Sequence, residues 1–302
     1  MSRSHRNLTP VLVLPAILIL TPLAMAEFIP VDTFETLPLG PIDDLNGWQA
    51  RHDTSVVCLD PEDETNQVLA VTTDSTWLYK NAFIPNESVR TLFLRFRFGE
   101  MLNYSFGMSD FSSPDQFGHF EVELSMTNAT NELRVNDDGT YEVLRVLSPD
   151  TWYNVWLQID NLNDHSRIYL HNRPGEDATE ADLLDSDGQT EFVFRDGRAG
   201  NLLNFYIKTG GGSGPGGPLY LDDIYLEDVD GLNLSNPVGT AGCAGDVDGN
   251  GITNLQDLAA LLAAYGSTSE DPNFIPGADF DGNGAIELSD LAFLLSDYGC
   301  GE

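Results

Sequence analysis

Residues 91–98 read Thr91-Leu-Phe-Leu-Arg-Phe-Arg-Phe98, with an apolar side chain at every second position from Leu92. Side chains alternate between the two faces of an extended strand, so one face here carries only apolar residues. Those residues are Leu92, Leu94, Phe96 and Phe98. The opposite face carries Arg95 and Arg97. We therefore expect a half-buried β-strand whose apolar face points into a core.

The same alternation recurs in Trp152-Tyr-Asn-Val-Trp-Leu-Gln-Ile-Asp160. Shorter stretches of this kind, separated by turn sequences such as Asn136-Asp-Asp-Gly139, follow one another along the chain. They are expected at 120–126, 141–146, 167–170, 191–194, 203–208 and 219–226. No long helical periodicity precedes position 250. The protein is therefore predicted to be mainly β, with a β-sandwich over residues 27–229.

A repeat with a different pattern follows near the C-terminus. Asp246-Val-Asp-Gly-Asn-Gly-Ile-Thr-Asn-Leu-Gln-Asp257 recurs, at an offset of 33 residues, as Asp279-Phe-Asp-Gly-Asn-Gly-Ala-Ile-Glu-Leu-Ser-Asp290. Both stretches match the twelve-residue EF-hand loop, in which oxygen atoms at fixed positions converge on Ca²⁺. Glycine at loop position 6 permits the positive φ of the sharp turn.

This pattern assigns six calcium ligands to each loop, with the backbone carbonyl acting at position 7. The ligands of the first loop are Asp246, Asp248, Asn250, Ile252, Asn254 and Asp257. Those of the second loop are Asp279, Asp281, Asn283, Ala285, Glu287 and Asp290. Two Ca²⁺ sites are therefore predicted.

Each loop is followed by a helical apolar pattern that ends at a glycine, Gly266 or Gly299. The leucines of the two helices are expected to bury one another. Those leucines are Leu258, Leu262, Leu291 and Leu295. Breaker residues stand before both loops, so neither loop has an entering helix. The predicted module is small and all-α.

A loop with only an exiting helix, repeated once and closed by Asp in place of Glu, resembles the type I dockerin module. The resemblance covers residues 243–302 and implies docking onto a cohesin-like or other surface protein. At loop positions 10 and 11 the family often has small hydroxyl residues. This chain has Leu255, Gln256, Leu288 and Ser289 there, and Thr253 replaces an apolar residue at position 8.

The N-terminus has the three parts of a secretory signal peptide over residues 1–26. A basic head precedes an apolar stretch at 11–23, and Ala24-Met-Ala26 offers the cleavage site. The apolar stretch is too short and too rich in proline to span a bilayer, so a secreted or cell-surface protein without a membrane span is expected. Residues 230–242, rich in Asn, Ser, Pro, Gly and Thr, are the predicted linker.

Charge and cysteines agree with that location. The chain has 48 acidic and 14 basic residues, a net charge of -34, so it would repel nucleic acid. Cys243 and Cys300 flank the repeats and are predicted to form a disulfide. Cys58 is left unpaired and is expected to be a small buried residue.

The sandwich resembles concanavalin-like and laminin-G-like jelly rolls in its opening Asp32-Thr-Phe-Glu35, its strand from Trp152 to Trp156 and its closing Tyr220-Leu-Asp-Asp-Ile-Tyr-Leu226. That resemblance implies a further structural Ca²⁺ near Glu35 and Asp223, although both could be ordinary solvated carboxylates. Aromatic rings and amides on one strand face would suit a sugar ligand. The candidates are Trp152, Asn154, Trp156 and Gln158. Alternatively, both tryptophans pack inside the sandwich.

A catalytic alternative rests on Glu121 and Glu123, which lie two apart on one expected strand face beside His119. Related sandwich-fold glucanases use Glu-x-Asp-x-x-Glu, and Met126 stands where the last carboxylate would be. We therefore assign no catalytic residue and lean against an enzyme.

The function predicted is that of a secreted calcium-binding protein. Its dockerin-like module would tether a glycan-binding sandwich to a scaffold or surface during extracellular polysaccharide binding or breakdown. A glycoside hydrolase or polysaccharide lyase is one alternative. A structural surface protein without a sugar ligand is the other.

Overall fold

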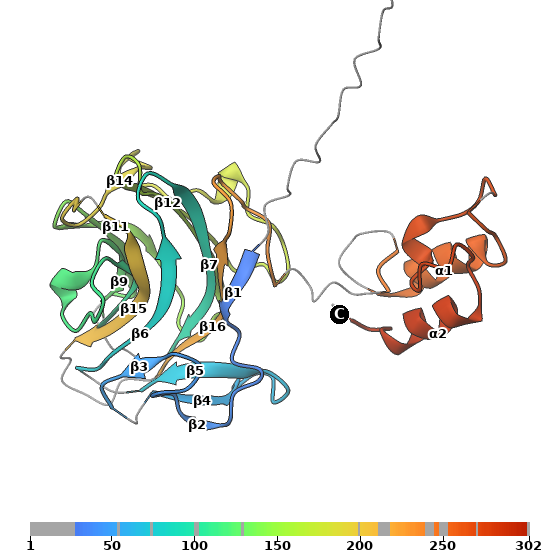
Figure 1. The fold of residues 1–302 in the computed structure, drawn as a ribbon, viewed down its shortest axis with the longest axis horizontal. Coiled ribbons are helices and arrows are strands. Elements are labelled where there is room, and N and C mark those ends of the chain that lie inside the picture. Colours follow the sequence, from blue (N-terminus) through green and yellow to red (C-terminus); the bar gives the residue numbers. More distant parts are fainter. Residues whose placement is uncertain are drawn as a thin grey trace, which may run out of the picture.

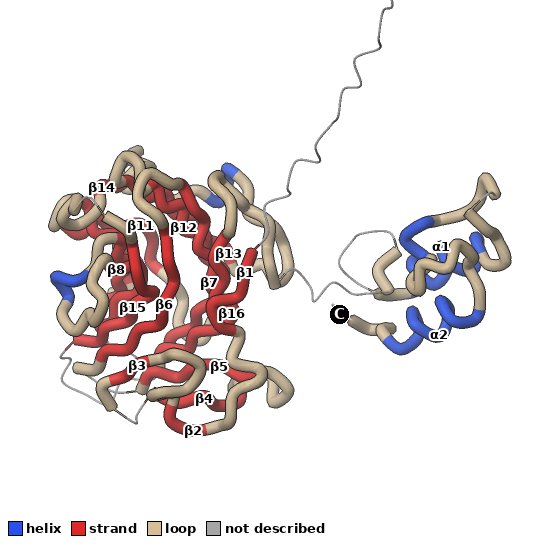
Figure 2. The backbone as a smooth tube through the Cα atoms, viewed as in Figure 1, coloured by secondary structure: helices blue, strands red, loops and turns tan. Residues whose placement is uncertain are grey.

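The computed structural model describes residues 28–52, 55–72, 75–99, 103–127, 130–198, 200–210, 218–238, 245–247, 253–269 and 271–300 (Figure 1). Within residues 28–227 the described chain forms β-strands in two antiparallel sheets (Figure 2). The prediction of a mainly β protein is confirmed.

The first sheet has the strand order β14-β13-β12-β7-β16-β5-β4-β2, and β1 pairs with β16 beside this path. Its strands are β1 (Phe28–Asp32), β2 (Gly40–Pro41), β4 (Ser55–Leu59), β5 (Gln67–Val71), β7 (Val89–Phe98), β12 (Tyr153–Asp160), β13 (His165–His171), β14 (Phe192–Val193) and β16 (Leu219–Glu227). The order is non-consecutive, so strands distant in sequence lie side by side, as in a jelly roll.

The second sheet has the strand order β11-β10-β9-β8-β15-β6-β3. Its strands are β3 (Gln49–Ala50), β6 (Trp77–Ile84), β8 (Asn103–Ser109), β9 (Val122–Met126), β10 (Glu132–Asp137), β11 (Thr140–Val146) and β15 (Leu202–Gly210). Short 3-10 turns occur at Phe117–His119 and Glu180–Asp182. Strand pairs in this sheet are antiparallel throughout the described residues.

One apolar core lies between the sheets. The four apolar residues quoted first all belong to it, and the strand they form is β7. They are Leu92, Leu94, Phe96 and Phe98. Phe96 contacts Phe106 of β8 with 5.2 Å between ring centroids, so the alternation along β7 joins the two sheets. This burial is the main stabilising term of the domain.

A second apolar cluster covers the opposite face of the first sheet. Phe93, Trp156 and Tyr169 are fully buried there, and Leu234 and Val238 pack over them. The indole N–H of Trp156 donates to the carbonyl of Ser235 at 2.9 Å. The segment 230–238 therefore belongs to the sandwich, which corrects the predicted start of the linker at residue 230. Residues 239–242 of that linker lie outside the described chain.

The C-terminal module contains two short helices, α1 (Leu255–Ala264) and α2 (Leu288–Ser296), and a 3-10 turn at Pro276–Ala278. Its core is formed by Leu261, Ala264, Ala278, Ile286 and Leu294. Leu258 and Leu291 are partly buried against this core, but Leu262 and Leu295 are each 52% exposed. The prediction that all four leucines pack together is therefore wrong for Leu262 and Leu295. Each helix is apolar on more than one side, and the structure buries the side that carries Leu261 or Leu294.

Backbone hydrogen bonds relate the two halves of the module. Gly266 N–H donates to Ile286 O, and Ile286 N–H donates to Ser267 O, at 2.8 and 2.9 Å. The equivalent bonds in the other half join Thr253 to Gly299 and Cys300 at 2.9 and 3.0 Å. The residues after each helix thus pair with the repeat loop, 246–257 or 279–290, of the other half.

Two cysteines lie in the described chain, and they differ in state. Cys300 is disulfide-bonded, and its expected partner Cys243 lies outside the described residues, so that pairing stays a prediction. Cys58 is free and half-buried, and burial raises the pKa of its thiol. Every helix in the described chain falls short of the length and apolar content needed to cross a bilayer. The expected signal peptide, residues 1–26, lies outside the described chain.

Candidate functional site

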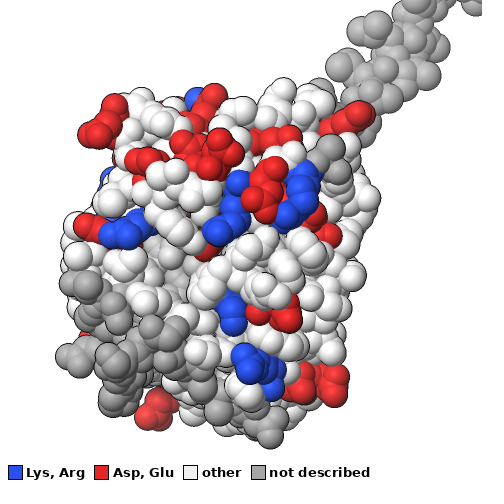
Figure 3. All heavy atoms as spheres, turned by 90° about the vertical axis from the view of Figure 1, so that its left-hand side faces the viewer, with Lys and Arg blue, Asp and Glu red and all other residues white. Residues whose placement is uncertain are grey.

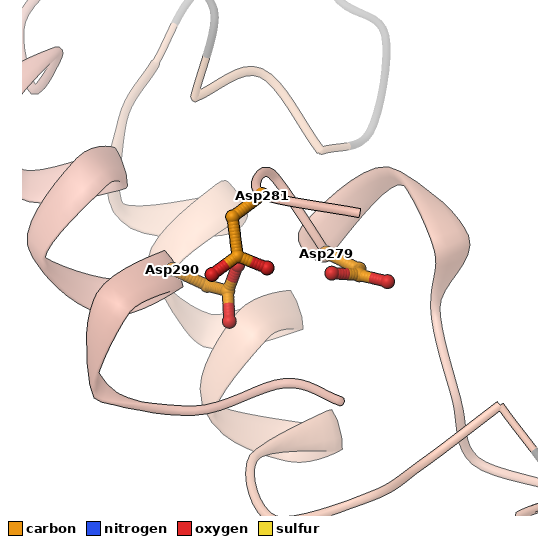
Figure 4. Close-up of side chains that lie close together, drawn as sticks. All are labelled: Asp279, Asp281 and Asp290. Carbon is orange, nitrogen blue, oxygen red and sulfur yellow. The ribbon is translucent and has the colours of Figure 1, made fainter. Parts of the chain in front are cut away.

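The loop 279–290, the second of the two predicted calcium loops, brings three carboxylates together. One oxygen each from Asp279, Asp281 and Asp290 lies within 4.8 Å of the others, and Figure 4 shows the three side chains around one space. Asp279 and Asp281 come from the loop, and Asp290 comes from the first turn of α2. A spherical, hard cation with a flexible oxygen shell suits this donor set, so the residues fit Ca²⁺.

Backbone N–H groups of the loop donate hydrogen bonds to its carboxylates. Gly284, at loop position 6, has φ of +85°, and its N–H donates to Asp279 Oδ2 at 2.9 Å. Asp290 accepts from the N–H groups of Phe280 and Glu287, both at 2.9 Å. Asp290 therefore joins the start of the loop to the start of α2 while its charge faces the other two carboxylates. The amide of Asn283 contacts Asp281 and Glu287.

The first loop can be compared only at its ends, because residues 248–252 lie outside the described chain. Asp257 accepts from the N–H groups of Val247 and Asn254, both at 2.9 Å, as Asp290 does in the second loop. Asn254 caps α1 by accepting from Gln256 at 2.7 Å. The predicted ligands Asp248, Asn250 and Ile252 stay predictions, as does the site they would complete.

The expected structural calcium site near Glu35 and Asp223 looks different. Asp223 forms an ion pair with Arg95 at 3.0 Å, while Glu35 accepts from the backbone N–H of Gln67 at 3.1 Å. Asp222 lies next to Asp223 in the chain. Burial raises the pKa of Asp222, and the negative charge of Asp223 raises it further. Among the described residues, the geometry of a three-carboxylate metal group occurs only in the second loop.

The four residues predicted to bind sugar on β12 and just before it do not form one surface. Trp156 is fully buried under residues 234–238, so it is not available to stack on a sugar, and that part of the prediction is wrong. Gln158 lines a polar hollow near Arg167 at the other end of the strand. Trp152 and Asn154 remain together, and they line a pocket of about 180 Å³.

That pocket is built from four segments, which are β7, residues 152–154, residues 172–175 and residues 236–238. Arg95 of β7 lies over the Trp152 ring at 4.9 Å, and Asn154 donates its amide to the carbonyl of Arg173 at 2.9 Å. Asn172, Pro174, Gly175, Asn236 and Val238 complete the lining. The Trp152 indole N–H is buried and has no hydrogen-bond partner among the described residues. An aromatic ring among amides is a composition suited to a hydroxyl-rich ligand.

Glu121 and Glu123 both lie on or beside β9 and are fully buried. Glu123 forms an ion pair with Arg195 at 2.7 Å and accepts from Tyr141 at 2.7 Å. Glu121 lies 2.6 Å from Arg198 Nε, and burial raises the pKa of Glu121 to about 7. Both carboxylates are paired with arginine and closed to solvent, so a substrate could not reach them in this conformation.

Charges on the outer surface are mixed. On the face shown in Figure 3, coloured basic side chains lie beside acidic ones, with uncharged surface between such groups. Among the ion pairs of the described residues, Arg198 contacts both Asp110 and Asp196. Basic groups that are compensated in this way do not form the concentrated positive patch that nucleic acid requires.

No family model and no curated protein matches the chain. Among solved structures, the carbohydrate recognition domain of Emp47p is 11% identical, with a TM-score of 0.41 over 64% of this chain and 95% of that domain. The catalytic domain of a glycoside hydrolase family 131 protein from Coprinopsis cinerea is 14% identical, with a TM-score of 0.45 over 68% of this chain and 96% of that domain. A sialidase is 10% identical, with a TM-score of 0.47 over 66% of this chain, and the chain spans only 18% of that protein. All these TM-scores are below 0.5, and we base no functional argument on them.

Proposed function

We propose that the chain is a secreted, noncatalytic protein that uses a calcium-dependent C-terminal module to tether a sugar-binding β-sandwich to a scaffold or surface. The observation that carries this proposal is the convergence of Asp279, Asp281 and Asp290 within 4.8 Å. Without a cation these three charges repel one another, so the loop needs Ca²⁺ to hold its shape. The first loop would bind a second ion.

Exposed apolar side chains on both helices support the tethering role. Leu255, Leu262 and Tyr265 have exposed counterparts, 33 residues later, at Leu288, Leu295 and Tyr298. Between 46% and 69% of each side chain is exposed, which is a large apolar surface for so small a module. The segment 243–300 has ten carboxylates and no basic side chain, so the partner we propose offers an apolar surface rimmed by Lys or Arg. A cohesin-like protein is our proposed partner.

The sandwich is assigned to sugar binding because Trp152 and Asn154 line one pocket. The ring supplies an apolar face, and the neighbouring amides of Asn172 and Asn236 supply hydrogen-bonding groups. A protein of net charge -34 would select against anionic polymers.

The calcium proposal is tested with the full chain, oxidised and freed of metal. Isothermal calorimetry is expected to detect two Ca²⁺ ions per chain, and far-ultraviolet circular dichroism to show a helical signal that chelator removes. Mg²⁺ at the same concentration serves as the control, because its preference for rigid octahedral geometry disfavours such a loop. No calcium uptake at millimolar concentration would overturn the proposal.

A polysaccharide hydrolase or lyase is the second candidate, favoured by the raised pKa of Glu121 two residues from Glu123. Release of reducing ends or unsaturated sugars from a panel of plant and marine polysaccharides would establish it. We expect none, because both carboxylates are paired with arginine and closed to solvent. Loss of such activity in Glu123→Gln would then assign it to this pair.

A further inference from the structure

The pocket around Trp152 adjoins a larger hollow. That hollow has a volume of about 630 Å³ and shares four lining residues with the pocket. The shared residues are Arg95, Trp152, Asn172 and Pro174. The two spaces therefore form one groove, with the indole of Trp152 at their junction.

The larger hollow is strongly acidic. Its lining includes five carboxylates, which are Glu35, Asp60, Glu62, Asp63 and Asp150. Arg95 is the one basic residue of that lining, and it already lies 3.0 Å from Asp223 and 3.7 Å from Asp222. Arg97 contacts Glu62 and Asp150, both at 3.3 Å. Arg95 and Arg97 thus face the five carboxylates that line the hollow, and an excess of negative charge remains beside the indole.

The carboxylates are fixed by backbone donors. Asp60 accepts from the N–H of Glu62 at 2.9 Å, and Asp63 accepts from the N–H of Thr65 at 2.9 Å. Hydrogen bonds from Thr65 lower the pKa of Asp63, so this carboxylate is charged at neutral pH. The loop is thereby set to accept further hydrogen bonds from a ligand.

We propose that this groove binds a saccharide that carries protonated amino groups, such as a chain of β-1,4-linked glucosamine. This inference rests on the proposed sugar-binding function and names the class of sugar. The indole of Trp152 would lie against the apolar face of one ring. Ammonium groups of the neighbouring units would donate to the carboxylates of the loop 60–63, and hydroxyl groups would meet Asn154 and Asn172.

A neutral glycan leaves this charge excess unused, and an anionic one is repelled by it. A protonated amine neutralises this excess charge through hydrogen-bonded ion pairs with the carboxylates. Discrimination should therefore depend on the amine more than on the sugar skeleton.

The experiment uses the full chain with saturating Ca²⁺ and measures binding by calorimetry. The probes are the hexamers of glucosamine, N-acetylglucosamine and glucose, all β-1,4-linked. The glucosamine hexamer is expected to bind about tenfold or more tightly than the other two, with a preference that shrinks at high salt. Pentalysine controls for general attraction to an acidic protein.

Two variants locate the site. Trp152→Ala is expected to weaken the glucosamine hexamer about tenfold and leave pentalysine unchanged. The double variant of Glu62→Gln with Asp63→Asn alters two exposed side chains and should lose the preference for the amine, and circular dichroism checks that its fold is unchanged. Asp187→Asn, an exposed carboxylate outside the groove, is the matched control.

The possible outcomes distinguish recognition of the amine from sugar binding in general. If all three hexamers bind equally and Trp152→Ala weakens them all, sugar binding stands and amine recognition is overturned. If the glucosamine hexamer binds but Trp152→Ala and the double variant leave its affinity unchanged, the groove is the wrong site. If no hexamer binds, both the amine proposal and the sugar-binding assignment lose their support, while calcium binding is tested separately.

Discussion

Thr253 Oγ1 donates a hydrogen bond of 2.8 Å to Asp297 Oδ2 in the C-terminal module, and the N–H of Gly245 donates to the same oxygen at 2.7 Å. A Cβ at position 245 would lie 2.7 Å from the Thr253 methyl group, so the site requires glycine. At an offset of 33 residues, the counterparts of this polar trio are the buried Ile286, Ala264 and Ala278. The two halves of the repeat thus fill equivalent places with different chemistry.

The effects of substituting Asp297 and Thr253 on the unfolding free energy of the module should be strongly coupled. Asp297→Ala alone is expected to destabilise the module by about 1–3 kcal/mol, because the buried Thr253 hydroxyl and the Gly245 N–H lose their acceptor. Adding Thr253→Ile, with Gly245 kept, should recover part of that loss, because it removes the buried hydroxyl that has lost its acceptor. Chemical denaturation in the presence of Ca²⁺ measures both free energies. Additive losses in the double variant would contradict this coupling.

The segment 230–238 is expected to be essential to the sandwich. A chain that ends at residue 229 should lose several kcal/mol of stability relative to one that ends at 238, because Trp156 and Tyr169 lose the cover of Leu234 and Val238. Thermal unfolding of the two truncated chains measures the difference.

A point variant tests the same contact in the full chain. Leu234→Ala should lower stability by about 1–3 kcal/mol. Ser235→Ala is the matched control, since Trp156 bonds to the backbone carbonyl of Ser235 and not to its side chain. Equal stability of the chains ending at 229 and 238 would show that the segment only rests on the sheet.

The strands and the second calcium loop could be predicted from sequence because their determinants are local. Alternation along 91–98 fixes which side of β7 is apolar, and the ligand spacing in 279–290 fixes which oxygens converge. Neither depends on a distant part of the chain. The expected strand faces of β7 and the convergence of three of the six second-loop ligands follow from these patterns.

The groove and the fate of Trp156 could not be predicted in the same way. Trp156 and Asn154 share a strand face, but a segment almost 80 residues later decides that this tryptophan is covered. The groove combines loop 60–66, β7, Trp152 and the turn at 172–175, so its acidity appears only when these segments meet. Burial of the Leu261 face in place of the Leu262 face is likewise decided by packing between helices.

Asp290 is expected to contribute both to the affinity for Ca²⁺ and to the stability of helix α2. Asp290→Asn removes one of the three converging charges and leaves one of its two N–H donors, on Phe280 and Glu287, without a carboxylate oxygen. We expect one of the two sites to weaken at least tenfold, with loss of helical signal at low Ca²⁺. Calorimetry and circular dichroism measure these effects. Asp271→Asn, in the same module but outside the loops, should bind two ions normally.

Glu121 should make the stability of the sandwich depend on pH. Burial raises its pKa from 4.5 to about 7, against the opposing effect of Arg198. Because the pKa of Glu121 is higher in the folded state, its protonated carboxyl adds to the unfolding free energy. This stabilisation is complete below pH 4.5 and is lost as the pH rises through about 7. Relative to Glu121→Gln, the native chain should therefore lose on the order of 1–3 kcal/mol of unfolding free energy between pH 4.5 and 8. Urea denaturation at both pH values measures this difference, with Asp187→Asn as control. Parallel pH profiles for the native chain and Glu121→Gln would mean that Arg198 fully compensates the buried charge.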